Sequence, residues 1–248
     1  MKRSLPVLAI LVCVGGAHAS DLSAAPDIGA SIGADTGWYG RIDAAHTLAD
    51  DADRLGGFVG GTSLTGFLDN GTALMGGVGI GYKFTDIWRA DVTARYGSDD
   101  VNGGADAAAL CGAGCSLEAL ARRETVDLDF NLYADLGTIM GVTPYVGAGI
   151  GLGHVSYEAP AAGLCGTGGC VERLPVSGGD GWRTNWSLMA GAAYGITERV
   201  LVDLGYRYTY SDDGDLLTAS LPDGSSLALK DDGSERHMVT LGLRLRFD

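Results

Sequence analysis

The stretch Glu235–Phe247, with the sequence ERHMVTLGLRLRF, alternates apolar and polar residues with a period of two. Side chains two positions apart lie on the same face of a β-strand, so the alternation indicates a strand with two different faces. One face carries Val239, Leu241, Leu243, Leu245 and Phe247, whereas the other carries Arg236, Thr240, Gly242, Arg244 and Arg246. The apolar face must be covered either by the core of a soluble sandwich or by membrane lipid.

The length and the repetition of this pattern distinguish the two cases. The same alternation extends through Thr125–Leu136 and Arg199–Ser211. A tilted strand needs ~10 residues to cross a bilayer, whereas the strands of globular proteins average only ~5 to 6 residues. The pattern therefore predicts a transmembrane barrel whose apolar side chains face lipid and whose polar side chains face the lumen.

Extended over the whole chain, the pattern predicts an all-β protein that forms a single closed antiparallel up-and-down transmembrane β-barrel of about eight strands. The predicted strands are Trp38–Ala45, Ala73–Phe84, Trp88–Gly97, Thr125–Leu136, Thr143–Tyr157, Trp182–Ile196, Arg199–Ser211 and Glu235–Phe247. The predicted long connections are His46–Thr72, Ser98–Glu124, Glu158–Gly181 and Asp212–Ser234, and the short ones centre on Thr85-Asp86, Thr138–Gly141 and Thr197-Glu198. Because such barrels have long extracellular loops and short periplasmic turns, both termini are expected on the periplasmic side.

The N-terminal residues predict a signal peptide. Lys2 and Arg3 precede the apolar run Leu5–Val14, and the triplet Ala17-His18-Ala19 fits a cleavage site. The apolar run is shorter than the ~20 residues that a membrane-spanning helix needs. We expect residues 1–19 to be removed on export, residues 20–36 to form a flexible lead, and residues 37–248 to form a barrel in the cell outer membrane.

The composition excludes two classes of protein. The formal net charge is −14 and falls to −16 when Lys2 and Arg3 leave with the leader. So acidic a chain does not neutralise phosphates, which excludes nucleic acid as a partner. The 41 glycines, and the lack of a second apolar run of ~18 residues, exclude a helical membrane protein. The sequence predicts neither a metal nor a cofactor.

Four cysteines follow the leader, in CGAGC (Cys111 and Cys115) and in CGTGGC (Cys165 and Cys170). An even number of cysteines in an exported protein favours disulfides. Three pairings are compatible with the sequence, so two local bridges and a pair of bridges between the segments remain alternatives. A structural zinc site is the rival interpretation, but the spacings are wider than the usual C-x-x-C of such sites.

Glycines and aromatic residues gather at particular positions of the predicted strands. Gly147, Gly149, Gly151 and Gly153 point to one side of a strand, where they leave room for large lumen side chains or allow a sharp bend. A phosphate-binding loop is excluded because no helical pattern follows. The aromatic residues near strand ends or on the lipid face, where such rings favour the bilayer interface, are Trp38, Trp88, Trp182, Trp186, Tyr194, Tyr206, Tyr208 and Tyr210.

The predicted register places many charges inside the barrel. The inward cations are Arg41, Lys83, Arg89, Arg95, Arg183, Arg207, Arg244 and Arg246, and the inward anions are Asp43, Asp91, Asp127, Asp129, Asp135 and Asp203. An unpaired buried charge is costly, so these groups are expected to pair across strands. Eight strands leave an interior just wide enough for side chains to fill, which favours a plugged lumen over the alternative of a small-solute pore.

One arrangement of residues offers catalytic chemistry. His154, Ser156 and Glu158 follow each other at intervals of two at the outer end of a predicted strand, so they share one face. A nucleophilic serine needs a base within hydrogen-bonding reach. The arrangement resembles that of outer-membrane lipid A deacylases, although Tyr157 stands where those enzymes have an asparagine. A lipid A-modifying hydrolase is therefore a remote alternative, and the sequence predicts that the protein is not an enzyme.

The chain resembles the eight-stranded outer-membrane proteins of the OmpA-transmembrane-domain type, particularly their porin-family surface-protein branch. The resemblance covers Gly37 to the C-terminus, through GWYGRIDAA (Gly37–Ala45), MGGVGIGYKF (Met75–Phe84), TPYVGAGIGLG (Thr143–Gly153) and the closing LGLRLRF. It implies a structural or surface-interaction role without a cofactor. The implied partners are outer-membrane lipid, the outer-membrane assembly machinery, and an extracellular ligand or host surface bound through the loops. Asp248 departs from the family pattern, because members usually end on the aromatic residue that the assembly machinery recognises.

Overall fold

The computed structural model describes residues 36–50, 53–59, 62–70, 73–108, 112–166, 169–174, 176–220 and 226–247. The predicted signal peptide lies outside these residues, as does the predicted lead up to residue 35. Within the described ranges, no helix is long and apolar enough to cross a membrane.

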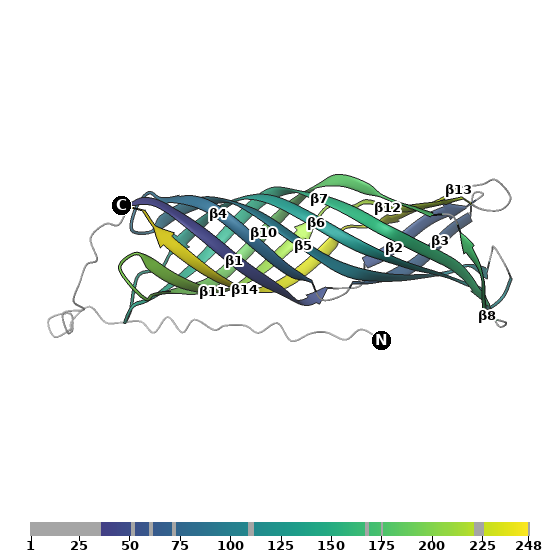
Figure 1. Cartoon of the computed structure of the whole chain (residues 1–248), viewed down its shortest axis with the longest axis horizontal. Coiled ribbons are helices and arrows are strands. Elements are labelled where there is room, and N and C mark those ends of the chain that lie inside the picture. The colour runs from purple at the N-terminus through teal and green to yellow at the C-terminus, as the bar shows by residue number, and fades with distance from the viewer. Residues whose placement is uncertain are drawn as a thin grey trace, which may run out of the picture. The chain divides into compact units, whose positions relative to one another are not determined.

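Eight antiparallel strands form the wall of the barrel (Figure 1). They are β1 (Gly37–Asp50), β4 (Leu74–Lys83), β5 (Trp88–Asp106), β6 (Ser116–Asp135), β7 (Val142–Gly166), β10 (Asp180–Gly195), β11 (Val200–Ser211) and β14 (Ser234–Arg246). Each of them pairs with its neighbours in this order, and β14 also pairs with β1. The predicted eight-stranded up-and-down barrel is confirmed.

Short turns join the strands at one end, as predicted. The β4–β5 and β10–β11 turns contain the same hydrogen bonds. In each, the hydroxyl oxygen of Thr85 or Thr197 accepts hydrogen bonds from the backbone N–H groups two and three residues later. This hydrogen bonding fixes a tight turn without long connecting segments. In the β6–β7 turn, Gly137, Met140 and Gly141 have positive φ angles, a conformation that glycine adopts without strain.

The prediction of four long loops is largely wrong, because much of each predicted loop forms β-strand. β5, β6 and β7 have 19, 20 and 25 residues, respectively. Six further strands continue the wall at the end opposite the short turns. They are β2 (Asp53–Val59), β3 (Thr62–Asn70), β8 (Gly169–Leu174), β9 (Val176–Gly178), β12 (Gly214–Ser220) and β13 (Ser226–Asp231). β3 pairs with the outer part of β5, and the pairing continues through β2, β13, β12 and β9.

These segments form strands because they contain alternating apolar side chains, which are few among the many glycines. Val101, Ala105, Leu117, Ala119 and Leu229 alternate with exposed neighbours and are all buried. Their alternation gives the outer segments an inward apolar face, so strand pairing satisfies the backbone while burying these groups.

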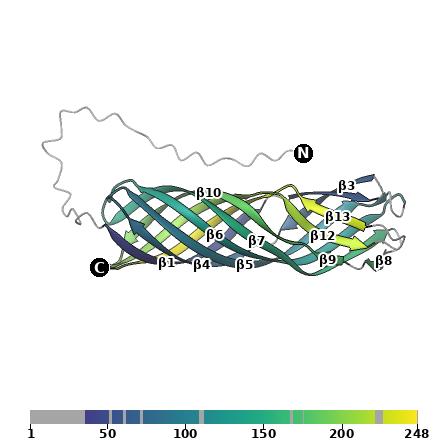
Figure 2. The ribbon, with the colours of Figure 1, turned by 90° about the horizontal axis from the view of Figure 1, so that it is seen from above.

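The outer extension, formed by β2, β3, β8, β9, β12, β13 and the outer parts of β5, β6 and β7, roughly doubles the length of the barrel. At ~3.3 Å per residue and a tilt of ~40°, a strand as long as β7 spans about 60 Å along the barrel axis, against an apolar band of about 25 Å in such proteins. Figure 2 shows the wall continuing beyond β1 and β4 into β3, β13 and β12. Roughly half of the longest strands therefore stand outside the membrane.

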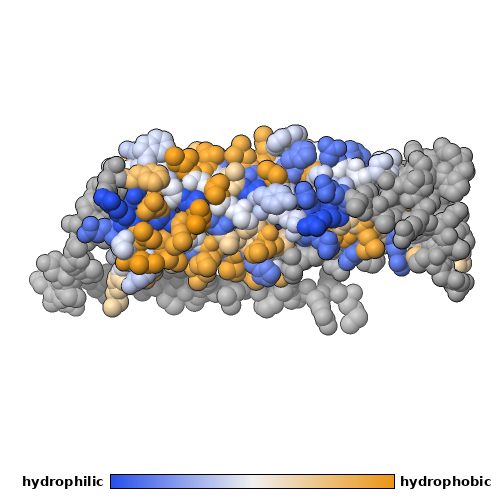
Figure 3. Space-filling view, in the orientation of Figure 1, coloured by the Kyte–Doolittle hydropathy of each residue, from blue (hydrophilic) through white to orange (hydrophobic). Residues whose placement is uncertain are grey.

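The two faces of the wall are reversed relative to those of a soluble β-barrel. Apolar side chains face outward, and charged side chains face the lumen. Leu241, Leu243 and Leu245 are 56%, 45% and 47% exposed, whereas Arg236 and Arg244 on the other face of the same strand are buried. Apolar surface dominates the half of the wall that carries β1, β4 and β14 (Figure 3). The predicted register is thus confirmed, with apolar side chains outward and charged ones enclosed.

Candidate functional site: a charged network in the lumen

The inward faces of the ring strands bring the predicted lumen charges together. Those on the inward faces are Arg41, Asp43, Lys83, Arg89, Asp91, Arg95, Asp127, Asp129, Asp135, Arg183, Asp203, Arg207 and Arg244. Arg246 instead lies at the turn end of β14, where its Nη1 is 3.5 Å from the Glu198 carbonyl oxygen. Arg183 is buried towards the outer end, and its guanidinium packs against Gly214.

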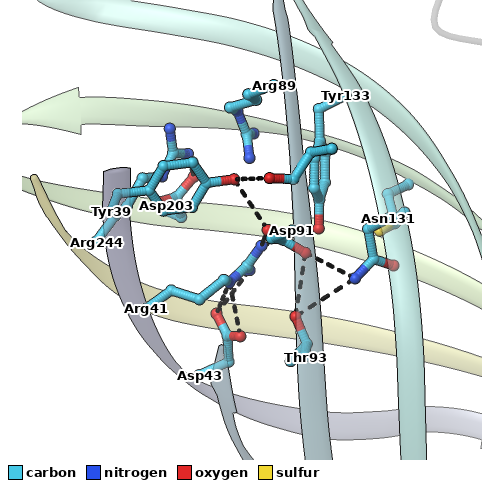
Figure 4. A network of polar contacts seen from close by, with 12 residues as sticks. Tyr39, Arg41, Asp43, Arg89, Asp91, Thr93, Asn131, Tyr133, Asp203 and Arg244 are labelled. Atoms are coloured by element: carbon cyan, nitrogen blue, oxygen red, sulfur yellow. Dashed lines mark hydrogen bonds and ion pairs between the residues drawn. The ribbon is translucent and has the colours of Figure 1, made fainter. Parts of the chain in front are cut away.

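Arg41 joins three strands across the lumen (Figure 4). Its Nε and Nη2 donate to the Asp43 carboxylate at 2.9 and 2.7 Å. Its Nη1 donates to Asp91 Oδ2 and to the Tyr133 hydroxyl, both at 2.8 Å. One guanidinium therefore binds two carboxylates and a phenol, which uses the forked donor geometry of arginine.

Asp91 is the most connected carboxylate of the network. Besides Arg41, it accepts hydrogen bonds from the Tyr39 hydroxyl at 3.1 Å, the Thr93 hydroxyl at 3.1 Å and Asn131 Nδ2 at 2.8 Å. Asp91 is 2% exposed, so these donors replace its hydration shell.

A second cluster lies nearer the turn end. Asp135 pairs with Arg89 Nε at 3.0 Å and with Lys83 Nζ at 3.4 Å. The Arg89 guanidinium also lies over two tyrosine rings, 3.9 Å from the Tyr133 centroid and 4.9 Å from that of Tyr145. Ring faces attract cations, so these tyrosines help to compensate the desolvation of a fully buried arginine.

Arg207 connects the middle of the lumen to β6 and β10. Its Nη2 donates to Ser187 Oγ at 2.7 Å and to Asn131 Oδ1 at 3.0 Å, and lies 3.6 Å from Asp129 Oδ2. Asp129 also pairs directly with Arg95. Elsewhere on the wall, Arg244 pairs with Asp203 between β14 and β11.

The network continues outward through residues absent from the predicted set. Arg236 Nη2 lies 3.3 Å from Asp127 Oδ2. Arg123 binds Asp99 through two hydrogen bonds, of 3.0 and 2.7 Å. Arg236 could have been found, because it alternates with Arg244 on one face of the closing strand. Arg123 and Asp99 fell in a predicted loop, where no inward face was assigned.

Glycines on β7 make room for large inward side chains of β6, as the sequence predicts. A Cβ atom added at each of four positions would lie within 3 Å of a β6 side chain: Gly147 against Tyr133, Gly149 against Asn131, Gly151 against Asp129 and Gly153 against Asp127. The Gly-x-Gly pattern therefore sets the width of the lumen at the network.

The charged network encloses a small space in the described part of the lumen. A cavity of about 10 Å³ lies among Arg123, Asp127, Arg183 and Arg236, which is room for about one water molecule. The side-chain amide of Asn185 and the hydroxyl of Thr209 are buried without a protein partner. Such polar atoms normally bind ordered water, so the network has capacity for a few internal waters.

Cys115, Cys165 and Cys170 lie at the outer end of the extension. Cys115 and Cys165 are both disulfide-bonded. Cys170 stands opposite Cys165 in the β7–β8 register, and Cys111 lies outside the described residues. The connectivity of the four cysteines stays a prediction.

His154, Ser156 and Glu158 share the outward face of β7, beyond the apolar band. His154 Nε2 lies 3.8 Å from Asp180 Oδ2, and its ring packs edge-on against Trp182 at 5.1 Å. No hydrogen bond joins His154 to Ser156 in this described segment. The described residues also hold no group of three or more His, Cys, Asp or Glu side chains arranged to bind a metal ion.

Comparison with known proteins agrees with this architecture. The profile of the outer membrane protein beta-barrel domain family matches residues 7–247. The chain belongs to this family. An uncharacterized protein of Brucella abortus (strain 2308) is 31% identical over 193 residues, which cover 69% of this chain and 67% of the relative.

Two better-described proteins also resemble this member of the family. The outer membrane protein PagN of Salmonella typhimurium is 31% identical over 142 residues, covering 54% of this chain and 55% of PagN. The outer membrane protein OprG of Pseudomonas aeruginosa has a similar fold, with a TM-score of 0.53 and 15% identity over 87% of this chain and 99% of OprG. The protein is thus an outer-membrane β-barrel, and its apolar band faces outer-membrane lipid.

Proposed function

We propose that this protein is a non-enzymatic surface protein of the outer membrane, whose lumen is plugged and whose outer extension contacts an extracellular ligand or a host surface. The observation that carries the proposal is the lumen network, in which ion pairs follow each other from Lys83–Asp135 to Arg123–Asp99. Buried pairs of this kind resist separation, because breaking one leaves an uncompensated charge. The role of the ring is then to hold the extension in place.

The alternative of a small-solute pore makes a different prediction in planar bilayers. For a plug, the full mature chain gives no steady conductance, whereas Arg244→Ala with Asp203→Ala opens a narrow path by removing an ion pair of zero net charge from the lumen. An exposed matched pair, Lys230→Ala with Asp215→Ala, is the control, since these residues lie 3.1 Å apart on the extension. Steady, voltage-independent conductance of the unaltered chain would instead support the pore.

The outer extension offers a surface for contact. A cavity of about 780 Å³ is lined largely by small residues of β5 and β6, among them Gly103, Gly104, Ala105 and Ala119. This volume falls in the range of small-molecule sites, ~300 to 1,000 Å³. The surface role is tested by attachment of bacteria to immobilised host matrix: cells that carry the full chain attach, and cells whose β5–β6 hairpin is shortened to a tight turn do not. Equal attachment by both strains, with both barrels folded, contradicts the role.

The hydrolase alternative depends on His154 and Ser156, and it is tested by mass analysis of lipid A. The proposal expects the same lipid A profile in cells with the unaltered chain, with Ser156→Ala and without the protein. A profile that changes with the protein and reverts in Ser156→Ala would replace the surface role with an enzymatic one. We further propose the outer-membrane assembly machinery as the partner that inserts the barrel.

A further inference from the structure

Five aromatic side chains form one continuous group on the outward face of β10, β11 and β14. This group, the outer aromatic patch, consists of Trp186, Tyr206, Tyr208, Tyr210 and His237. The Trp186 ring stacks on Tyr210 at 5.8 Å and lies 5.3 Å from Tyr208. Tyr208 lies 5.2 Å from the His237 ring, which in turn is bound by the Tyr206 hydroxyl.

The patch lies at the outer margin of the lipid-facing band. Leu188, Leu204 and Leu241 are exposed on the same three strands, on the side of the patch nearer the turn end, so the patch borders the hydrocarbon region. On β1 and β4, by contrast, the exposed outer residues include Leu48 and Leu74. Tyr96 on β5 and Trp182 on β10 are also exposed at this end, but the five contacting rings of the patch lie together on three neighbouring strands, which a uniform aromatic girdle does not require.

Polar groups within the patch distinguish it from the aromatic cluster at the other end of the barrel. Trp38, Tyr82 and Phe84 form that inner cluster, with ring centroids 5.3 Å apart. The outer patch adds the imidazole of His237, and the Glu235 carboxylate lies beside the Tyr208 hydroxyl. The patch therefore presents ring faces together with hydrogen-bonding groups at one surface.

The charges around the patch decide which headgroup it suits. The outward faces of Asp180–Gly195, Val200–Ser211 and Ser234–Arg246 contain no lysine or arginine, while Glu235 contributes a carboxylate at the border of the patch. A phosphate would meet no cation of the kind that normally binds it. A sugar ring has apolar C–H faces that pack on aromatic rings, and hydroxyl groups that pair with phenol, imidazole and carboxylate.

We infer that the outer aromatic patch binds the uncharged sugar headgroup of a glycolipid in the outer leaflet. The acyl chains of this lipid would lie along the exposed leucines of β10, β11 and β14, and the sugar would lie against Trp186, Tyr208 and His237. The inference concerns the lipid face of the barrel, so it does not depend on the proposed role of the lumen or of the extension.

Native mass spectrometry of the full mature chain tests the inference. The folded protein is placed in micelles that contain equal amounts of monoglucosyl diacylglycerol and phosphatidylglycerol with the same acyl chains. We expect preferential retention of the glucolipid, and about a fivefold loss of that preference in Tyr208→Leu or Trp186→Leu, since one ring contact contributes about 1 kcal/mol. Tyr208→Phe keeps the ring and should retain most of the preference.

Trp38→Leu is the matched control, because it removes an exposed ring from the inner cluster. It should leave the lipid preference unchanged. Equal retention of the two lipids, or preference for phosphatidylglycerol, overturns the inference. An equal loss in Trp38→Leu and Tyr208→Leu also overturns it, since the rings would then act as general interface anchors. A mobility shift on boiling verifies that each variant is folded. If Tyr208→Leu does not fold, Trp186→Leu takes its place as the test variant.

Discussion

Replacement of Asp91 by alanine should be among the most destabilising single substitutions in the barrel. Asp91 accepts hydrogen bonds from Arg41, Tyr39, Thr93 and Asn131 while it is 2% exposed. Removal of one partner of a buried ion pair costs about 3 to 5 kcal/mol, because the remaining charge loses its compensation. Arg41 keeps Asp43 as a partner, so we expect a loss of about 3 kcal/mol in the free energy of unfolding, at the lower end of this range.

The measurement is reversible urea unfolding of the protein in lipid vesicles, followed by tryptophan fluorescence. Asp100→Ala is the control, because Asp100 is an exposed carboxylate on the same strand and should cost less than about 0.5 kcal/mol. A double-mutant cycle with Arg41→Ala should give a coupling energy of about 1 to 3 kcal/mol. If Asp91→Ala and Asp100→Ala unfold at the same urea concentration, or the coupling is zero, the network does not stabilise the barrel.

Three other predictions concern the wall. Gly151→Val should prevent folding or lower the free energy of unfolding by more than about 1 to 3 kcal/mol, because its Cβ would lie 2.5 Å from a backbone oxygen. Gly76→Ala should be neutral, because no atom lies within 4 Å of the added Cβ, and the mobility shift on boiling compares the two variants. Leu243→Arg should cost about 2 to 4 kcal/mol in urea unfolding, and a cost near zero would place this residue away from the bilayer centre. Cys115 and Cys165 should react with a maleimide only after reduction, and labelling of the untreated protein, read by mass, would contradict their oxidised state.

The sequence was sufficient to predict the membrane-spanning ring, because two-residue periodicity is a direct consequence of strand geometry. Leu243 and Arg244 must face opposite ways in any strand, and only a lipid-facing barrel makes the apolar side the outer one. The β7 glycines were predictable for the same reason, since four glycines at intervals of two can only share a face. The face of the strand on which each side chain lies depends only on its position in the local sequence.

The partners of charges on different strands were not predictable, because their pairing depends on the register between strands. Arg41 finds Asp91 across 50 positions of the chain, and no local pattern indicates that contact. The outer strands were missed for a different reason. Glycine and aspartate are depleted in ordinary strands, so composition outweighed the weaker alternation of Leu117 and Ala119. Tertiary pairing with β3 and β7 overrides that propensity.

The distribution of charge connects the lumen to the outer surface. Most of the arginines that follow the leader lie inside the ring, where aspartates and tyrosine rings compensate them. The chain that follows the predicted leader has a formal net charge of −16, and the enclosed aspartates offset most of the enclosed cations, so most of this negative charge lies outside the lumen. If the extension contacts a partner as proposed, we expect that partner to be neutral or cationic, because an anionic surface would be repelled. The same logic, applied at the lipid boundary where no arginine faces outward beside Tyr208, selects a sugar over a phosphate as the group that meets the aromatic rings.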